Sequence, residues 1–206
     1  MPSQANSEKS AVKPQDDRRS FLKQAGLMTL GVLAATSWME TASASPAHND
    51  AKSVPGKASS TEADIAILNV ALALEHQAIA AYQIGAESGL LGSTVLAVAV
   101  KFQTQHKAHA SVLIETIGKL GGKAVMAKQA NEYGFPVELL KNQTDVLHFA
   151  AGLEKGAASA YLGAVPAFHN RELAKAAASI LGDETMHWAI LLNALGEDPV
   201  PDAFIA

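Results

Sequence analysis

The sequence predicts an all-α fold, a four-helix bundle of two antiparallel hairpins joined by a long crossover. Three observations lead to this prediction. The 206 residues are 49% hydrophobic but only 5% aromatic, and they are rich in alanine and leucine, which favour helices. Apolar residues recur every three or four positions in four long segments, as on the buried face of a helix. Glycine, proline and capping residues mark the ends of these segments.

The first 44 residues predict an export signal that lies outside the fold. The basic stretch Asp17–Lys23 (DRRSFLK) is followed by an apolar run and by TASA, which ends at Ala44. The adjacent Arg18 and Arg19 resemble a twin-arginine signal, although an aspartate precedes them where that pattern usually has Ser or Thr. The apolar run is shorter than the ~20 residues that span a bilayer, so an uncleaved anchor is the weaker alternative. We expect cleavage near Ala44 and delivery to the periplasm or cell envelope.

Residues 45–60 predict a flexible spacer, and the folded region is expected over residues 61–196. The spacer is small, polar and contains proline. The first helix should begin at a capping residue, Thr61 or Asp64, and end near Ser88, because glycine follows.

The remaining helices follow from the same signals. The second helix should cover residues 93–117 and pair with the first, because the break between them is short. The third should cover 144–165, ending near a proline, and the fourth should run from Asn170 to Gly196. The intervening segment, Lys119–Gln143, is long enough to cross the side of a bundle whose helices are ~40 Å long.

The two hairpins look like copies of one another. Leu74–Tyr82 (LEHQAIAAY) matches Leu153–Tyr161 (LEKGAASAY), and each has a glutamate seven residues before a tyrosine. His109–Gly118 (HASVLIETIG) matches His187–Gly196 (HWAILLNALG), and each has a histidine nine residues before a glycine. Alanine-rich sequence alone would not place the acid, the tyrosine and the histidine at equivalent positions in both hairpins.

Every predicted helix places one or two acids or imidazoles on its apolar face. In the fourth helix, Glu184 and His187 share a stripe with Ile180 and Leu191. In each hairpin these groups lie at similar distances from the turn, so they should meet at one level of the bundle. The inward polar residues are Glu75, His106, His109, Glu154, Glu184 and His187.

Six inward polar groups at one level predict a metal site. Three buried carboxylates would repel one another and would protonate unless cations were present. An acid and an imidazole three residues apart on a helix can bind one ion together. A buried salt bridge between Glu184 and His187 is the alternative. Tyr82 and Tyr161 lie on the same faces. They should pack in the core, donate hydrogen bonds to the ligands or supply an oxidisable phenol.

The pattern resembles the ferritin-like superfamily of dimetal-carboxylate bundles, in which two helices each supply a glutamate and two each supply Glu-x-x-His. Glu75 and Glu154 match the lone glutamates, and Glu184–His187 matches one Glu-x-x-His. His109 matches the second imidazole, but His106 stands where the remaining glutamate is expected. His106 is therefore either a ligand or a hydrogen-bond partner of one. The resemblance implies one or two transition-metal ions per chain, iron or manganese.

Three functions remain open from the sequence: a redox enzyme acting on oxygen, peroxide or ferrous iron, a metal-binding module without turnover, and a structural or stress-related bundle. The formal charge of −4 indicates no nucleic-acid partner. There is no cysteine to ligate metal or relay electrons. The expected partners are the twin-arginine export machinery and a small-molecule or ion substrate, with a homodimer as an open assembly. Residues 197–206 should form a tail without the short fifth helix of storage ferritins, because they contain two prolines.

Overall fold

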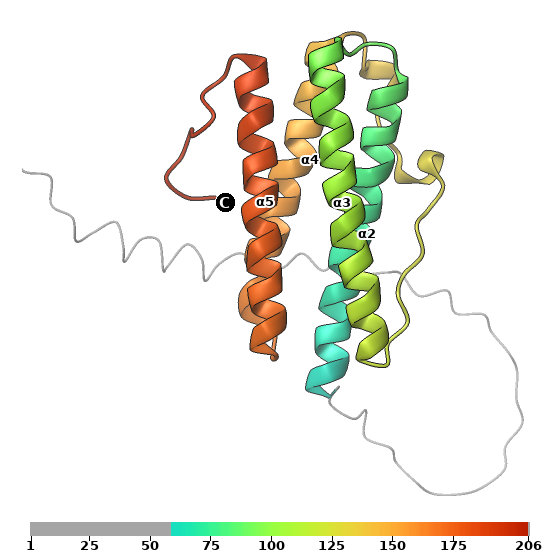
Figure 1. The fold of residues 1–206 in the computed structure, drawn as a ribbon, viewed down its shortest axis with the longest axis vertical. Coiled ribbons are helices and arrows are strands. Elements are labelled where there is room, and N and C mark those ends of the chain that lie inside the picture. Colours follow the sequence, from blue (N-terminus) through green and yellow to red (C-terminus); the bar gives the residue numbers. More distant parts are fainter. Residues whose placement is uncertain (1–58, 206) are drawn as a thin grey trace, which may run out of the picture. The chain divides into compact units, whose positions relative to one another are not determined.

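The computed structural model describes residues 59–205, which form an all-α bundle of four long helices without strands (Figure 1). The predicted fold class is therefore confirmed. The predicted export signal and most of the predicted spacer lie outside the described residues. The long helices are α2 (Ser60–Glu87), α3 (Ser93–Lys119), α4 (Gln143–Ala164) and α5 (Arg171–Leu195).

Short polar side chains set the starts of three helices. Ser59 caps α2 in a reciprocal capping box with Glu62, so the prediction of Thr61 or Asp64 as the cap is wrong. Asn142 caps α4, and Asn170 caps α5. The helix α5 ends at Gly196, whose φ of 77° is a left-handed conformation that glycine adopts at little cost. The described part of the tail, residues 197–205, contains no helix.

Asp64 ties the start of α2 to the turn between α4 and α5. The residue is 3% exposed. One carboxylate oxygen accepts a hydrogen bond from the backbone N–H of His169 at 2.8 Å, and the other accepts one from Asn170 at 3.0 Å. Two backbone donors next to the start of α5 are satisfied in this way. The contact holds the two hairpins together at one end.

The crossover between α3 and α4 runs along the bundle from one end to the other (Figure 1). The side chain of Asn69 on α2 fixes it, because this amide donates to the carbonyl of Lys123 and accepts from the N–H of Val125. The crossover carries two short 3-10 turns, Ala130–Tyr133 and Val137–Leu139. It leaves the hairpins antiparallel, with α2 packed mainly on α3 and α4 mainly on α5.

The core consists of two apolar layers, one toward each end of the bundle. One layer includes Leu72, Ile117 and Ile180, and the other includes Phe102 and Leu191. Each helix passes through both layers, and its buried polar residues, apart from Asp64 at one end of α2, lie between them. Only α2 among the described helices is long and apolar enough to cross a membrane. This helix packs in the core of the bundle and contributes a buried glutamate, Glu75, to the polar layer.

We expect Asp64→Ala to lower the free energy of unfolding by about 1–3 kcal/mol, because two backbone N–H groups lose their buried acceptor. Urea denaturation followed by circular dichroism measures this. Asp202→Ala, in the exposed tail, is the matched control and should leave stability unchanged. Equal stability of the two variants would contradict the role assigned to Asp64.

Candidate metal centre

The six polar residues expected on the inner faces do come together at one level. Glu75 comes from α2, Glu154 from α4, and each of the other two helices contributes two residues. Their ligand atoms form two groups of four, and within each group they lie within 4.8 Å of one another. The first group is Glu75, His106, His109 and Glu184, and the second is His106, Glu154, Glu184 and His187.

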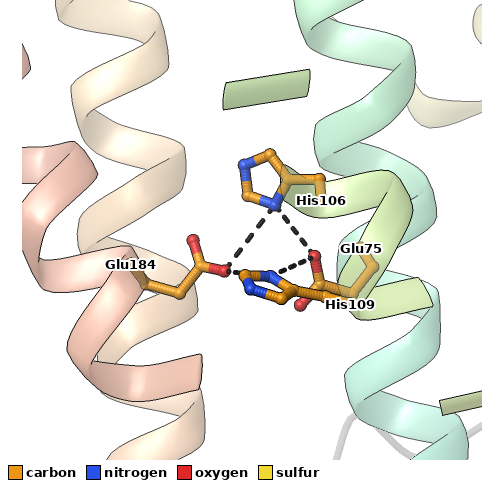
Figure 2. Close-up of side chains that lie close together, drawn as sticks. All are labelled: Glu75, His106, His109 and Glu184. Atoms are coloured by element: carbon orange, nitrogen blue, oxygen red, sulfur yellow. Dashed lines mark hydrogen bonds and ion pairs between the residues drawn. The ribbon is translucent and has the colours of Figure 1, made fainter. Parts of the chain in front are cut away.

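Glu184 lies between the two groups and belongs to both. Its Oε1 is 3.1 Å from Nδ1 of His109, and its Oε2 is 3.6 Å from Nδ1 of His187. Figure 2 shows Glu184 reaching from α5 toward the first group, opposite Glu75 on α2. One carboxylate therefore directs one oxygen to each group, which is the arrangement of a carboxylate shared by two cations.

Within residues 59–205, five buried atoms of this cluster have no hydrogen-bond partner: Nδ1 of His109, Nδ1 of His187, Oε2 of Glu154 and both oxygens of Glu184. A buried polar atom left unsatisfied costs about 1–3 kcal/mol. These atoms point at one another without forming good hydrogen bonds, so a cation between them would satisfy several at once. The donor set therefore fits a metal ion.

His106 makes different contacts from the other two histidines. Its Nδ1 is 2.8 Å from Glu75, and its Nε2 is 3.2 Å from Glu154. The ring therefore links the two lone glutamates, at the place where the family pattern has a carboxylate. A neutral imidazole has one lone pair, so His106 can bind one ion but cannot bridge two as a carboxylate can. Its two predicted roles, ligand and hydrogen-bond donor, both remain compatible with these contacts.

When no cation is present, the carboxylates of the cluster stabilise the protonated form of the imidazoles. Burial acts to lower the pKa of His106, but hydrogen bonds to Glu154 and Glu75 and the carboxylate charges outweigh it and raise the pKa to about 10. Burial is likewise outweighed at His109 and His187, where nearby carboxylates, Glu184 among them, raise the pKa to about 9. At neutral pH a cation must therefore displace protons from the imidazoles it binds.

The two tyrosines link the hairpins reciprocally. Tyr82 on α2 donates a hydrogen bond to Glu154 on α4, and Tyr161 on α4 donates one to Glu75 on α2 at 2.6 Å. Both rings also pack in the apolar layers, so two of the roles weighed from the sequence, packing and hydrogen bonding, hold together. Burial first, and then the adjacent carboxylate, raise the pKa of each phenol. Each hydroxyl therefore stays protonated and holds its glutamate in place.

Sequence reasoning missed two residues that contact the histidines from outside. Asp183 places Oδ2 3.3 Å from Nε2 of His109 and 3.5 Å from Nε2 of His187. Gln105 places Oε1 3.1 Å from Nε2 of His187. An acceptor at Nε2 orients the ring and leaves Nδ1 for a metal. The internal repeat could have pointed to these two residues, because positions 105 and 183 are separated by the same 78 residues as His109 and His187.

The other described histidines lie outside the cluster. His148 is exposed and lies 3.7 Å from Glu197, and His169 lies at the turn beside Asp64. Trp188 packs toward α4, with Nζ of Lys155 5.3 Å from the centre of its ring.

Comparison with known proteins agrees with this architecture. A solved structure of a conserved hypothetical protein from Mycobacterium tuberculosis, rv2844, is 24% identical with a TM-score of 0.59, and the match covers 71% of this chain and 99% of that chain. A ferritin-like, diiron-carboxylate protein from Bacillus anthracis str. Ames is 23% identical with a TM-score of 0.55, covering 68% and 99%. These likenesses show the fold. No curated protein sequence matches this chain. The sequence pattern of the ferritin-like domain matches residues 63–197, both hairpins and the crossover, and the chain therefore belongs to the ferritin-like domain family.

Proposed function

We propose that this protein binds one or two transition-metal ions between its four helices and uses them for redox chemistry on oxygen, peroxide or ferrous iron. The observation that carries the proposal is the convergence on one layer of the bundle of five buried nitrogen and oxygen atoms that have no hydrogen-bond partner among the described residues. A cation there would give several of these atoms a partner at once.

The two groups of side chains define which residues would hold each ion. One ion would take Glu75 and His109, the other would take Glu154 and His187, and Glu184 would serve both. Three carboxylates carry three negative charges. With one divalent ion the site therefore keeps one negative charge, and with two divalent ions it has one positive charge. The number of bound ions, one or two, therefore depends on the protonation of His106. The doubly protonated ring adds a positive charge, whereas the neutral ring adds a ligand nitrogen.

The donor set restricts the metal. Mixed carboxylate and imidazole ligands suit iron, manganese and zinc. The Bacillus anthracis neighbour is described as a diiron-carboxylate protein, which supports iron here, and the family resemblance keeps manganese as the alternative. When bound, either ion supplies a redox couple and a position for a small oxidant. The apolar layers above and below exclude water, and Tyr82 and Tyr161 fix the outer oxygens of two glutamates.

Two other functions compete with this one. A module that binds metal without turnover would need the same ligands, so only an activity measurement separates it from the enzyme. A purely structural bundle is less favoured, because apolar side chains of the same volume would stabilise the core without the desolvation of six polar groups. Electrons for turnover would come from the substrate or from a partner protein, since the chain has no cysteine for a thiolate relay.

We expect the wild-type protein, purified from its native compartment, to carry at least one transition-metal ion per chain. Glu184→Gln keeps the shape of the side chain but removes its charge, so metal affinity should fall at least by the roughly 10–100-fold that losing a partner of a metal ligand costs. Elemental analysis and metal titration measure both. Glu172→Gln, on the exposed start of α5, is the control and should bind as wild type. Metal-free wild-type protein would remove the proposal.

Catalysis has its own test. The metal-loaded wild-type protein should accelerate either the aerobic oxidation of ferrous iron or the breakdown of hydrogen peroxide, followed by absorbance, and Glu184→Gln should lose that activity in proportion to its lost metal. Stoichiometric metal binding with neither reaction accelerated would leave the non-catalytic module as the function.

We also propose that the protein is exported through the twin-arginine machinery to the periplasm or cell envelope. The basic, apolar and small-residue pattern of the first 44 residues supports this, and export in the folded state would allow the metal to be bound beforehand. Mass spectrometry of the envelope fraction should find a mature N-terminus near Ser45, and replacing Arg18 and Arg19 with lysine should block its formation. A full-length chain retained in the cytoplasm would contradict export.

A further inference from the structure

A groove between α3 and α5 leads from the surface to the cluster. Its volume is about 580 Å³, and His109 and Asp183 lie in its wall. Small side chains keep it open, among them Ala108, Ser179 and Gly182. These two helices contact each other little compared with the partners inside each hairpin. At Gly182 an added Cβ would meet no atom within 4 Å, so the space beside it is free.

The exposure of the cluster is confined to this side. The side chains of His109 and Asp183 are 15% and 19% exposed, whereas each of the other five clustered side chains in the described chain is at most 2% exposed. His109 is therefore the metal-ligand candidate that a species in the groove meets directly. Asp183 lies beside it, with Oδ2 in contact with the outer nitrogens of His109 and His187.

The groove offers a cation a carboxylate ligand. Asp183 is the one carboxylate among the described residues that line it, and no lysine or arginine lines it. A second cavity, of about 210 Å³, lies beside Tyr82 at the other apolar layer. Its walls are almost entirely apolar, including Val98, Leu147 and Leu191. A hydrated cation would lose its water there without gaining a ligand.

We propose that divalent cations reach the centre through the α3–α5 groove, with Asp183 as the first carboxylate they meet and His109 as the first ligand. The inference rests on the proposed metal binding and adds a route to it. The groove is lined by small and apolar side chains together with Asp183 and His109, so a divalent ion that enters it finds its carboxylate and imidazole ligands at these two residues. Asp183 is thus a positioning residue with a second task, because it also orients both imidazoles.

Two glycines provide a matched test of the route. Gly182 on α5 and Gly156 on α4 are both exposed and helical, both have free space at the Cβ position, and each lies two residues from a cluster glutamate. Only Gly182 lines the groove. Uptake of Co²⁺ by the metal-free protein, followed by stopped-flow absorbance of the Co²⁺ ligand-field bands, measures the rate. Gly182→Phe should slow uptake about tenfold or more, with final occupancy unchanged, and Gly156→Phe should take up Co²⁺ at the wild-type rate.

A reversible plug keeps the test independent of how the phenylalanine variants fold. The native chain has no cysteine, so Gly182→Cys and Gly156→Cys each carry a single thiol. Treatment of the folded proteins with benzyl methanethiosulfonate adds a benzylthio group. It should slow Co²⁺ uptake only at position 182, and a reductant should restore the rate. Uptake that is unaffected by the plug at position 182, or slowed equally at both positions, would overturn the route.

Removing the charge tests the carboxylate. Asp183→Asn keeps an oxygen that can accept from an imidazole N–H but loses the negative charge, so uptake should slow and its rate should depend less on ionic strength. An unchanged rate and salt dependence would contradict this part of the proposal. The failures are distinguishable: wild-type protein that takes up no Co²⁺ would refute metal binding itself, whereas normal uptake unaffected by the groove variants would refute only the route.

Discussion

The structure depends on burying three carboxylates and three imidazoles in one layer between two apolar cores. Each charge would be costly to bury alone. The nearby carboxylates outweigh burial at the three imidazoles and raise their pKa values, but five atoms of the cluster still find no hydrogen-bond partner in the described chain. The rest of the bundle holds the layer together. Asp64 fastens the hairpins at one end, and the two tyrosines hold a glutamate each from the opposite hairpin. A cation at this layer would give partners to the atoms that these contacts leave without one.

The internal duplication explains the symmetry of the centre and makes its main break visible. Tyr82 and Tyr161 exchange glutamate partners across the hairpins, and Gln105 and Asp183 each contact the histidine of the other hairpin. The break lies at the equivalent positions 106 and 184, which hold a histidine and a glutamate. Because only the glutamate can share its oxygens between two ions, the two halves of the centre are chemically unequal, and two bound ions would differ in affinity.

The sequence was sufficient to predict the four helices and the six inward residues. Helical periodicity determines which side chains face the core, and the distance from each turn determines their level along the bundle. The sequence was not sufficient to predict the contacts between the two hairpins. The register between them decides that Tyr82 reaches Glu154, and no local pattern encodes that register. Asp183 and Gln105 lie off the apolar stripes, so helical periodicity gave no reason to place them at the site. Asp64 has the residue type of a helix cap, but its partners lie more than a hundred residues away.

The central claim is that these six side chains hold metal at one depth of the bundle. Anomalous diffraction at the absorption edge of the bound metal, from crystals of the metal-loaded protein, tests it most directly. The account predicts a peak beside Glu184 within bonding distance of Nδ1 of His109 or His187, and two peaks on either side of this glutamate if two ions bind. Metal-loaded crystals without an anomalous peak among the six side chains would contradict it.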